Sequence, residues 1–80
     1  MKLMVLNLPR DFTKQDIAEM FKVYGNIRGC DLILDEETGK SKGFAFVEMA
    51  LDHEGDIAID ALHGSQQGRN KIRVKMADER

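Results

Sequence analysis

The chain has 80 residues, 42% of them hydrophobic, and a formal net charge of −2. This size and composition predict one compact domain over residues 1–80 and exclude a disordered chain, although the length is near the lower limit for folding without disulfides or metal. The only cysteine, Cys30, excludes an internal disulfide, and one cysteine with two distant histidines forms no recognisable zinc site, so we expect no metal or small-molecule cofactor.

The first predicted element is a buried strand at residues 3–8, LMVLNL, which ends at Pro9. The run is too short for the core of a signal peptide and far too short to span a bilayer. We therefore expect a soluble protein of the cytoplasm, or of the nucleus if the source is eukaryotic, with no membrane partner.

A helix should follow, because Thr13 can cap its start and Asp16 would lie in its first turn, where a negative charge is favourable. Gly25 is a natural helix stop. Between these two signals, apolar residues recur at the i, i+3, i+4, i+7 spacing of an amphipathic helix: Ile17, Met20, Phe21 and Tyr24.

Two strands joined by a polar turn come next. Residues 27–34 form the second strand, and DEETGKS, residues 35–41, forms the turn. The third strand, KGFAFVEM at residues 42–49, is rich in aromatic and β-branched residues. Successive strand side chains point to opposite faces. One face therefore holds Ala45, Val47 and Met49. The other holds Phe44, Phe46 and Glu48.

A second helix is predicted from Asp52, a candidate cap, to just before Gly64. Its apolar stripe includes Gly55, which either lets the helix approach the sheet closely or is a weak point in the helix; the sequence allows both. Residues 65–68, SQQG, should be a loop. The final strand, residues 70–76, alternates two sets of side chains: apolar Ile72, Val74 and Met76, and basic Lys71, Arg73 and Lys75.

The element order is strand, helix, strand, strand, helix, strand. It predicts an α+β fold, a ferredoxin-like βαββαβ sandwich with a four-stranded antiparallel sheet and two helices on one face. Neither helix has a second apolar stripe, so both should cover the same face of the sheet. The uncovered side, which we call the open face, should display Met4, Leu6, Asp31, Ile33, Phe44, Phe46, Glu48, Lys71, Arg73 and Lys75.

Charge is unevenly distributed along the chain. Nucleic-acid binders usually carry a basic footprint, and the net charge of −2, taken alone, argues against one. Residues 52–60 contain four acids and no Lys or Arg, however, whereas residues 69–75 contain four bases and no acid. Because charges are screened over about 8 Å at physiological salt, the basic segment can act locally; an ordinary solvated edge strand is an equally good interpretation of it.

The third strand carries a family resemblance. KGFAFVEM resembles the octamer of the RNA recognition motif, K/R-G-F/Y-G/A-F/Y-V-x-F/Y, at seven of its eight positions, and LMVLNL resembles the shorter hexamer of the same family. The order and separation of the two segments also fit, and the resemblance covers essentially the whole chain. The sequence is similar to the small single-motif RNA-binding proteins of bacteria; a domain excised from a longer eukaryotic protein would look the same.

The resemblance implies a single-stranded RNA-binding module without catalytic activity. In the family, aromatic side chains on the central strands stack unpaired bases, and basic groups hold the phosphates. Carried over to this sequence, Phe44 and Phe46 become stacking platforms and Lys42 becomes a phosphate contact. Arg73 and Lys75 would hold sugar or phosphate oxygens without choosing a base.

Two positions depart from the family pattern. Met49 replaces the final aromatic of the octamer, but on the covered face, where it should affect packing only. Met4 replaces the aromatic of the hexamer on the open face, where it can still contact a base as a polarizable apolar side chain. A base–aromatic stack contributes roughly 1–3 kcal/mol, so we expect binding that is weak, micromolar or poorer, and strongly salt-dependent.

Other functions compete with RNA binding. The apolar part of the open face could instead bury a protein partner or a second copy of the chain, as a protein-interaction or homodimerisation module. An acyl-phosphate hydrolase would need a phosphate-cradling loop after the first strand, but residues 7–13 offer Arg10 and no glycine, so we do not expect an enzyme. For the two phenylalanines the alternative is burial under a second layer, for which 80 residues leave little chain.

Overall fold

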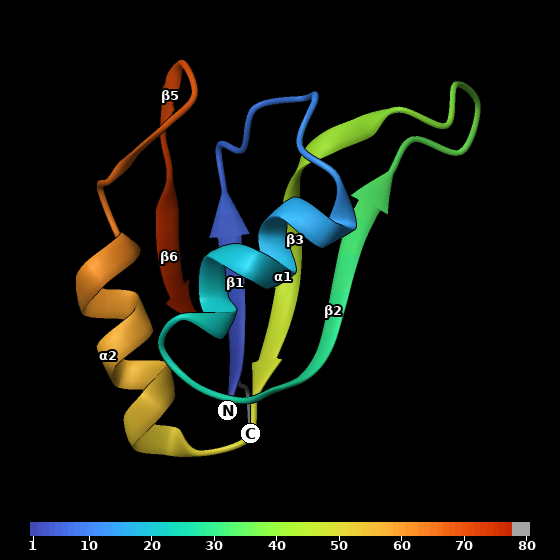
Figure 1. Cartoon of the computed structure of the whole chain (residues 1–80). Coiled ribbons are helices and arrows are strands. Elements are labelled where there is room, and N and C mark those ends of the chain that lie inside the picture. The colour runs from blue at the N-terminus through green and yellow to red at the C-terminus, as the bar shows by residue number, and fades with distance from the viewer. Residues whose placement is uncertain (78–80) are drawn as a thin grey trace.

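The computed structural model describes residues 1–77. Four strands form an antiparallel sheet in the order β2-β3-β1-β6, and two helices cover one side of it (Figure 1). The elements are β1 (Lys2–Leu6), α1 (Lys14–Lys22), β2 (Ile27–Leu34), β3 (Ser41–Met49), α2 (Asp52–Leu62), β4 (Gln66–Gln67), β5 (Asn70–Lys71) and β6 (Arg73–Met76). The predicted ferredoxin-like α+β fold is confirmed. Neither helix of this described range is long and apolar enough to cross a membrane.

The alternation predicted for the central strands is confirmed. Side chains of β1 and β3 on the helix-covered side are fully buried: Leu3, Val5, Ala45, Val47 and Met49. They pack into one core with the inner faces of the helices, which contribute Ile17, Phe21, Ala58 and Leu62. On the open face, the side chains of the same two strands keep partial exposure: Met4, Leu6, Phe44 and Phe46.

Helix α1 begins at the predicted cap, Thr13, and Asp16 adds a second bond that makes this a reciprocal capping box. The Thr13 hydroxyl accepts a hydrogen bond from the Asp16 N–H at 3.1 Å, and the Asp16 carboxylate accepts one from the Thr13 N–H at 2.9 Å. The helix ends at Lys22, however, before the predicted stop at Gly25. A Cβ on Gly25 would collide with Glu54, whose carboxylate accepts a hydrogen bond from Asn26 N–H. Gly25 therefore permits the loop to approach α2.

The prediction that Asp52 caps α2 is wrong. Asp52 is the first helical residue, and Leu51 precedes it as a cap without a side-chain hydrogen bond. The Asp52 carboxylate instead lies 3.7 Å from the amino group of Met1. One turn further on, buried Gly55 faces the Met1 side chain, which a Cβ would displace. Of the two interpretations of Gly55, close approach is therefore the one that the structure supports.

The last predicted strand is two elements in the structure. Residues 70 and 71 pair with β4, inside the predicted loop, and only Arg73–Met76 joins the main sheet as β6. The break falls at Ile72, which bonds back to the segment after α2: its N–H donates to the Ser65 carbonyl at 3.0 Å. Lys71 consequently lies in the β4–β5 hairpin, so its predicted place on the open face is wrong.

Candidate nucleic-acid interface

Two phenylalanines stand side by side on the open face. Phe44 and Phe46 occupy alternate positions of β3, a central strand, and both are partly exposed. Their ring centroids lie 6.3 Å apart and their planes meet at 86°, an edge-to-face arrangement that aromatic pairs favour. The open face thus offers two ring surfaces at a right angle to each other and not one flat platform.

Strand pairing aligns further site residues with Phe46. Met4 on β1 is paired with Phe46 on one side and with Lys75 of β6 on the other, while Asp31 of β2 is paired with Phe46. Directly paired residues of antiparallel strands are neighbours on one face. The structure therefore brings Met4 and Lys75 together with Phe46, in a row across the sheet that runs Asp31, Phe46, Met4, Lys75.

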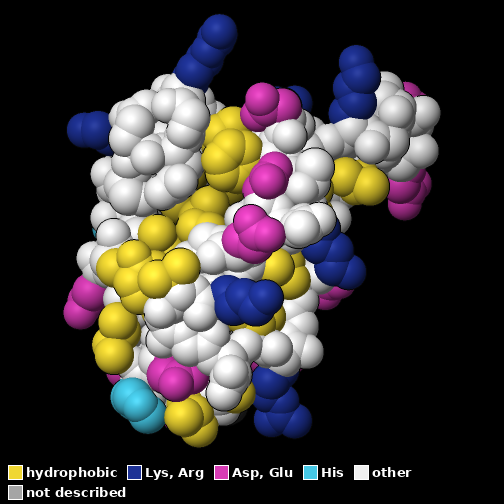
Figure 2. Space-filling view, viewed as in Figure 1, with side chains coloured by type: hydrophobic (Ala, Val, Ile, Leu, Met, Phe, Trp, Pro, Cys, Tyr) yellow, Lys and Arg dark blue, Asp and Glu magenta, His cyan; other side chains and the backbone are white. Residues whose placement is uncertain are grey.

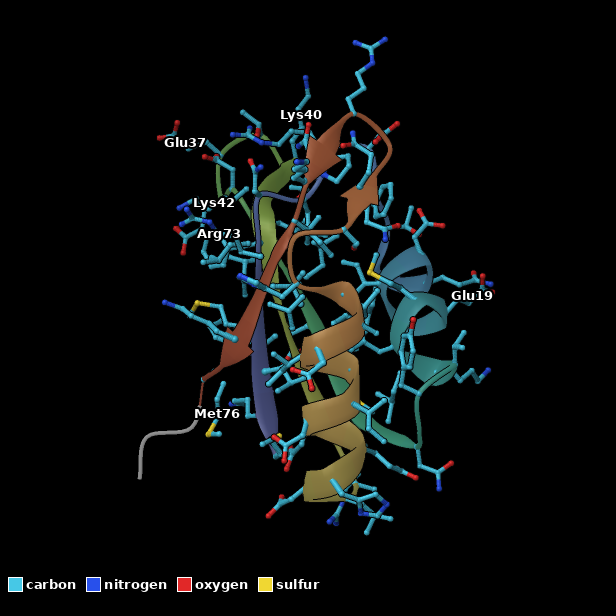
Figure 3. All side chains as sticks on the ribbon, turned by 90° about the vertical axis from the view of Figure 1, so that its left-hand side faces the viewer. Glu19, Glu37, Lys40, Lys42, Arg73 and Met76 are labelled. Atoms are coloured by element: carbon cyan, nitrogen blue, oxygen red, sulfur yellow. The ribbon has the colours of Figure 1, made fainter. Side chains whose placement is uncertain are left out.

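Cations gather at the end of the open face where β3 begins. Lys42, Arg73 and Arg10 line an open cleft of about 670 Å³, with Phe44 also in its wall; we call this the cationic cleft. Lys42 and Arg73 both lie on the side of the sheet away from the helices (Figure 3). Lys75 is two residues further along β6, beside Met4 and not in the cleft.

Arg10 is a cleft residue for which the sequence pattern indicated no role in RNA binding. It follows Pro9 in the loop after β1, and a Cβ on Gly43 would come within 3.3 Å of its Nε. Gly43 has φ of 87°, a left-handed conformation that favours glycine. The strand pairing explains how Arg10 reaches the site. Because β1 pairs antiparallel with β3, the loop that leaves β1 lies beside the start of β3.

A reciprocal pair of asparagines ties the loop after β1 to the β4–β5 hairpin. Asn7 Nδ2 donates to the Lys71 carbonyl at 2.9 Å, and Asn70 Nδ2 donates to the Asn7 carbonyl at 3.1 Å. Asn7 has φ of 62°, which asparagine adopts more readily than most residues. These bonds hold Asn7 and Asn70 in the wall of the cationic cleft.

Lys2 is a second residue that the pattern did not single out. Its Nζ lies 5.7 Å from the centroid of the Phe46 ring, within cation–π range. Lys2 is paired with Glu48, a residue of the open face. An exposed cation–π contact contributes about 0.5–1 kcal/mol, less than the roughly 1–3 kcal/mol of a base–aromatic stack. A stacked base can therefore displace the ammonium group from the ring.

The helix-covered side has a different character. Acidic and basic side chains are interspersed on it, around a hydrophobic band between α1 and α2 (Figure 2). The acidic run of residues 52–60 belongs to α2, which lies on the other side of the sheet from Lys42 and Arg73 (Figure 3). The net charge of −2 therefore does not describe the cationic cleft.

The turn between β2 and β3 is organised by one carboxylate. Asp35 Oδ1 accepts hydrogen bonds from the backbone N–H of Thr38 at 3.1 Å and of Glu37 at 2.8 Å. These bonds hold the pKa of the Asp35 carboxyl below its ordinary value, and the bond from Thr38 has the larger effect. The turn determines where the chain re-enters the sheet, just before Lys42.

Acid should loosen this turn. Because folding lowers the pKa of Asp35, its ionised carboxyl stabilises the turn above the pKa of the unfolded chain, and that contribution is lost as pH falls through the folded-state pKa. We expect NMR hydrogen exchange to show protection of the Glu37 and Thr38 amides falling over that interval. Asp35→Asn is the control, because its amide does not titrate: the same fall in the variant would contradict this assignment.

Cys30 lies where its thiol is not activated as a nucleophile. Partial burial raises the pKa of its thiol, and its Sγ donates to the Lys14 carbonyl at 3.8 Å. A nucleophilic cysteine needs the opposite, a lowered pKa. Nor do three His, Cys, Asp or Glu side chains gather anywhere in residues 1–77 in a way that could hold a metal ion.

Known proteins share both the sequence and the fold. The profile of the RNA recognition motif matches residues 3–73. RbpF of Nostoc sp. strain PCC 7120 is 39% identical over 77 residues, which cover 96% of this chain and 73% of RbpF.

Two solved structures superimpose closely. RNA binding protein PG1 gives a TM-score of 0.95 at 35% identity, with 100% of this chain and 96% of that chain covered. A Sex-lethal protein–RNA complex gives 0.93 at 31% identity, with 98% and 47% covered. The octamer on β3, the ferredoxin-like fold and these similarities agree, and the chain belongs to the RNA recognition motif family.

Proposed function

We propose that the protein binds single-stranded RNA on its open face and catalyses no reaction. The observation that carries this proposal is the juxtaposition of two partly exposed phenylalanine rings with a cationic cleft. Unpaired bases stack on aromatic rings, while lysine and arginine hold the connecting phosphates. Family membership and the RNA-bound structure of a relative support the same function.

The two rings contact different parts of the RNA. A base that lies flat on Phe46 meets Phe44 edge-on, because the ring planes are 86° apart. Two bases can lie flat on both rings only if the backbone turns between them. Phe46 is the better platform, since apolar Met4 extends its surface across the strand pair. Phe44 borders the cationic cleft and contacts either a second, turned base or the sugar that precedes it.

The phosphates follow the cations. Arg10, Lys42 and Arg73 lie together at the Phe44 end of the open face, and Lys75 continues the basic edge along β6. Binding of a single strand through phosphate contacts falls with salt, with a log–log slope of about −0.7 per contact. Three contacts in the cleft would thus give a slope of about −2.

NMR titration with a short degenerate single-stranded RNA pool tests this function. We expect chemical-shift changes in β1 and β3 around Phe44 and Phe46, with further changes at Lys42 and Arg73. The changes should be lost in the Phe44→Ala/Phe46→Ala variant, because the ring surfaces are gone. Shifts confined to α2, or shifts of the open face that persist in this variant, would overturn the proposal.

The partly exposed apolar side chains of the open face support a second candidate, a protein-interaction or homodimerisation module. Met4 and Leu6 lie there with the two phenylalanines, and all four side chains are partly exposed. Sedimentation over a concentration series, with and without RNA, separates the candidates. A dimer that RNA dissociates would assign self-association to the same face. A monomer at every concentration would exclude homodimerisation, and the second candidate would then require a different protein as partner.

A further inference from the structure

Asp31 is the acidic side chain directly opposite Phe46 on the open face. Its Cα is paired with that of Phe46 between β2 and β3, and such pairs have Cβ atoms about 5 Å apart. The side chain is exposed. Within residues 1–77 there is one ion pair, between the amino group of Met1 and Asp52. Asp31 therefore has no cation of this range within ion-pair distance. Among the described residues, a carboxylate without an ion-pair partner therefore borders the ring on which we place a base.

The negative charge of Asp31 repels RNA phosphates and so opposes RNA binding, unless the carboxylate accepts hydrogen bonds from a base. The cations that would hold phosphates lie elsewhere: Arg10, Lys42 and Arg73 are beside Phe44. Lys2 lies over the Phe46 ring itself, at 5.7 Å from its centroid, and a stacked base would take its place. Lys75 is separated from Asp31 by two residues of the row. A base stacked on Phe46 can direct one edge toward β2. Asp31 would then meet the edge of a base and not a phosphate.

The four bases present different edges to a carboxylate, which has two acceptor oxygens and no donor. Guanine has two adjacent donors on its Watson–Crick edge, N1–H and the N2 amino group, one for each oxygen. Adenine and cytosine have one amino group next to an acceptor nitrogen, and uracil has one N–H between two carbonyls. Bases in single-stranded RNA are read on these edges. Guanine is therefore the one base that can donate to both carboxylate oxygens without placing one of its own acceptor atoms against them.

We infer that Asp31 is a specificity-determining residue that selects guanine for the base stacked on Phe46. The inference rests on the proposed function, because it requires a base at that ring. Glu48 lies on the same face, but it is paired with Lys2 and Gly29 and not with Phe46. Glu48 is thus a matched control, a carboxylate on the open face without the position opposite the ring.

The experiment compares three short RNAs that are uridine except for a central guanosine, adenosine or inosine, which lacks the N2 amino group. Fluorescence anisotropy gives Kd for each. We expect the unmodified protein to prefer guanosine over adenosine by about fivefold or more, the low end for a bidentate contact, with inosine between them. In Asp31→Asn the preference should fall to within about twofold, because an amide can pair with either purine. Glu48→Gln should bind all three more tightly and keep the preference.

The outcomes separate this inference from the proposed function. Equal affinity for guanosine and adenosine, or a preference that Asp31→Asn leaves unchanged, would overturn the inference while RNA binding stands, provided that Phe46→Ala still weakens binding of all three RNAs. Loss of the preference in Glu48→Gln would also overturn it, because general charge would then explain the effect. Binding of none of the RNAs, or binding that Phe46→Ala does not weaken, would overturn both.

Discussion

Replacement of Phe46 by alanine is expected to weaken binding of a short single-stranded RNA roughly five- to 150-fold, the equivalent of one base–aromatic stack of roughly 1–3 kcal/mol. Phe46 lies in the middle of the open face, between Asp31 and Met4. The buried core is on the other side of the sheet, so truncation removes the ring surface without opening a cavity there. Fluorescence anisotropy at about 150 mM salt measures the change.

Phe12→Ala is the matched control for this variant. Phe12 is also a phenylalanine of intermediate burial, but it packs against the core. Its loss should lower the free energy of unfolding more than the loss of Phe46, and leave the RNA affinity of the folded protein unchanged. Denaturant unfolding of both variants checks the first expectation. A Phe46→Ala protein that bound RNA as tightly as the unmodified chain would remove the stacking site from the proposed function.

Local patterns were sufficient to predict much of the fold. The period of two along residues 42–49 placed Phe46 on the open face and Met49 in the core, because strand side chains alternate whatever else the chain does. The start of α1 was predictable because threonine is a favoured cap residue and Asp16 follows it in the first turn. What failed depends on residues distant in sequence: Asp52 lies near the amino group of Met1 and does not cap its own helix.

The end of the chain shows the same limit. An alternating run from residue 70 to residue 76 predicted one strand, but Ile72 bonds to Ser65 and divides it. His63, the residue that follows α2, accepts a hydrogen bond at Nδ1 from the N–H of Val74 on the sheet edge, at 3.0 Å. Both outcomes depend on how the segment after α2 returns to the sheet. Hydrophobic alternation carries no information about that path.

The candidate site was predictable to a similar degree. The octamer identified Lys42, Phe44 and Phe46, since a family motif marks positions one by one. It could not identify Arg10, which joins the site through the pairing of two strands about forty residues apart in the chain. Lys2 was missed for a related reason: its place over Phe46 depends on its pairing with Glu48.

Met4→Phe should tighten RNA binding, by up to roughly five- to 150-fold if the new ring gains a full base stack. Met4 lies on the central strand β1, paired with Phe46, and is partly exposed on the open face. A phenylalanine there restores the aromatic that the family's hexamer carries at this position, next to an existing ring. The reference is the unmodified protein, which we expect to bind at micromolar or weaker Kd at about 150 mM salt; nanomolar binding would show that Met4 is not a weakness.

Met49→Phe is the same exchange on the opposite side of the sheet. Met49 is fully buried, and an oversized side chain in a packed core costs about 1–3 kcal/mol. This variant should therefore unfold at lower denaturant and bind RNA no more tightly than the unmodified protein. Equal gains from both exchanges would mean that affinity follows a general change in the domain. If only Met4→Phe tightens RNA binding, the methionine at position 4 limits RNA affinity, whereas the methionine at position 49 affects only the packing of the core.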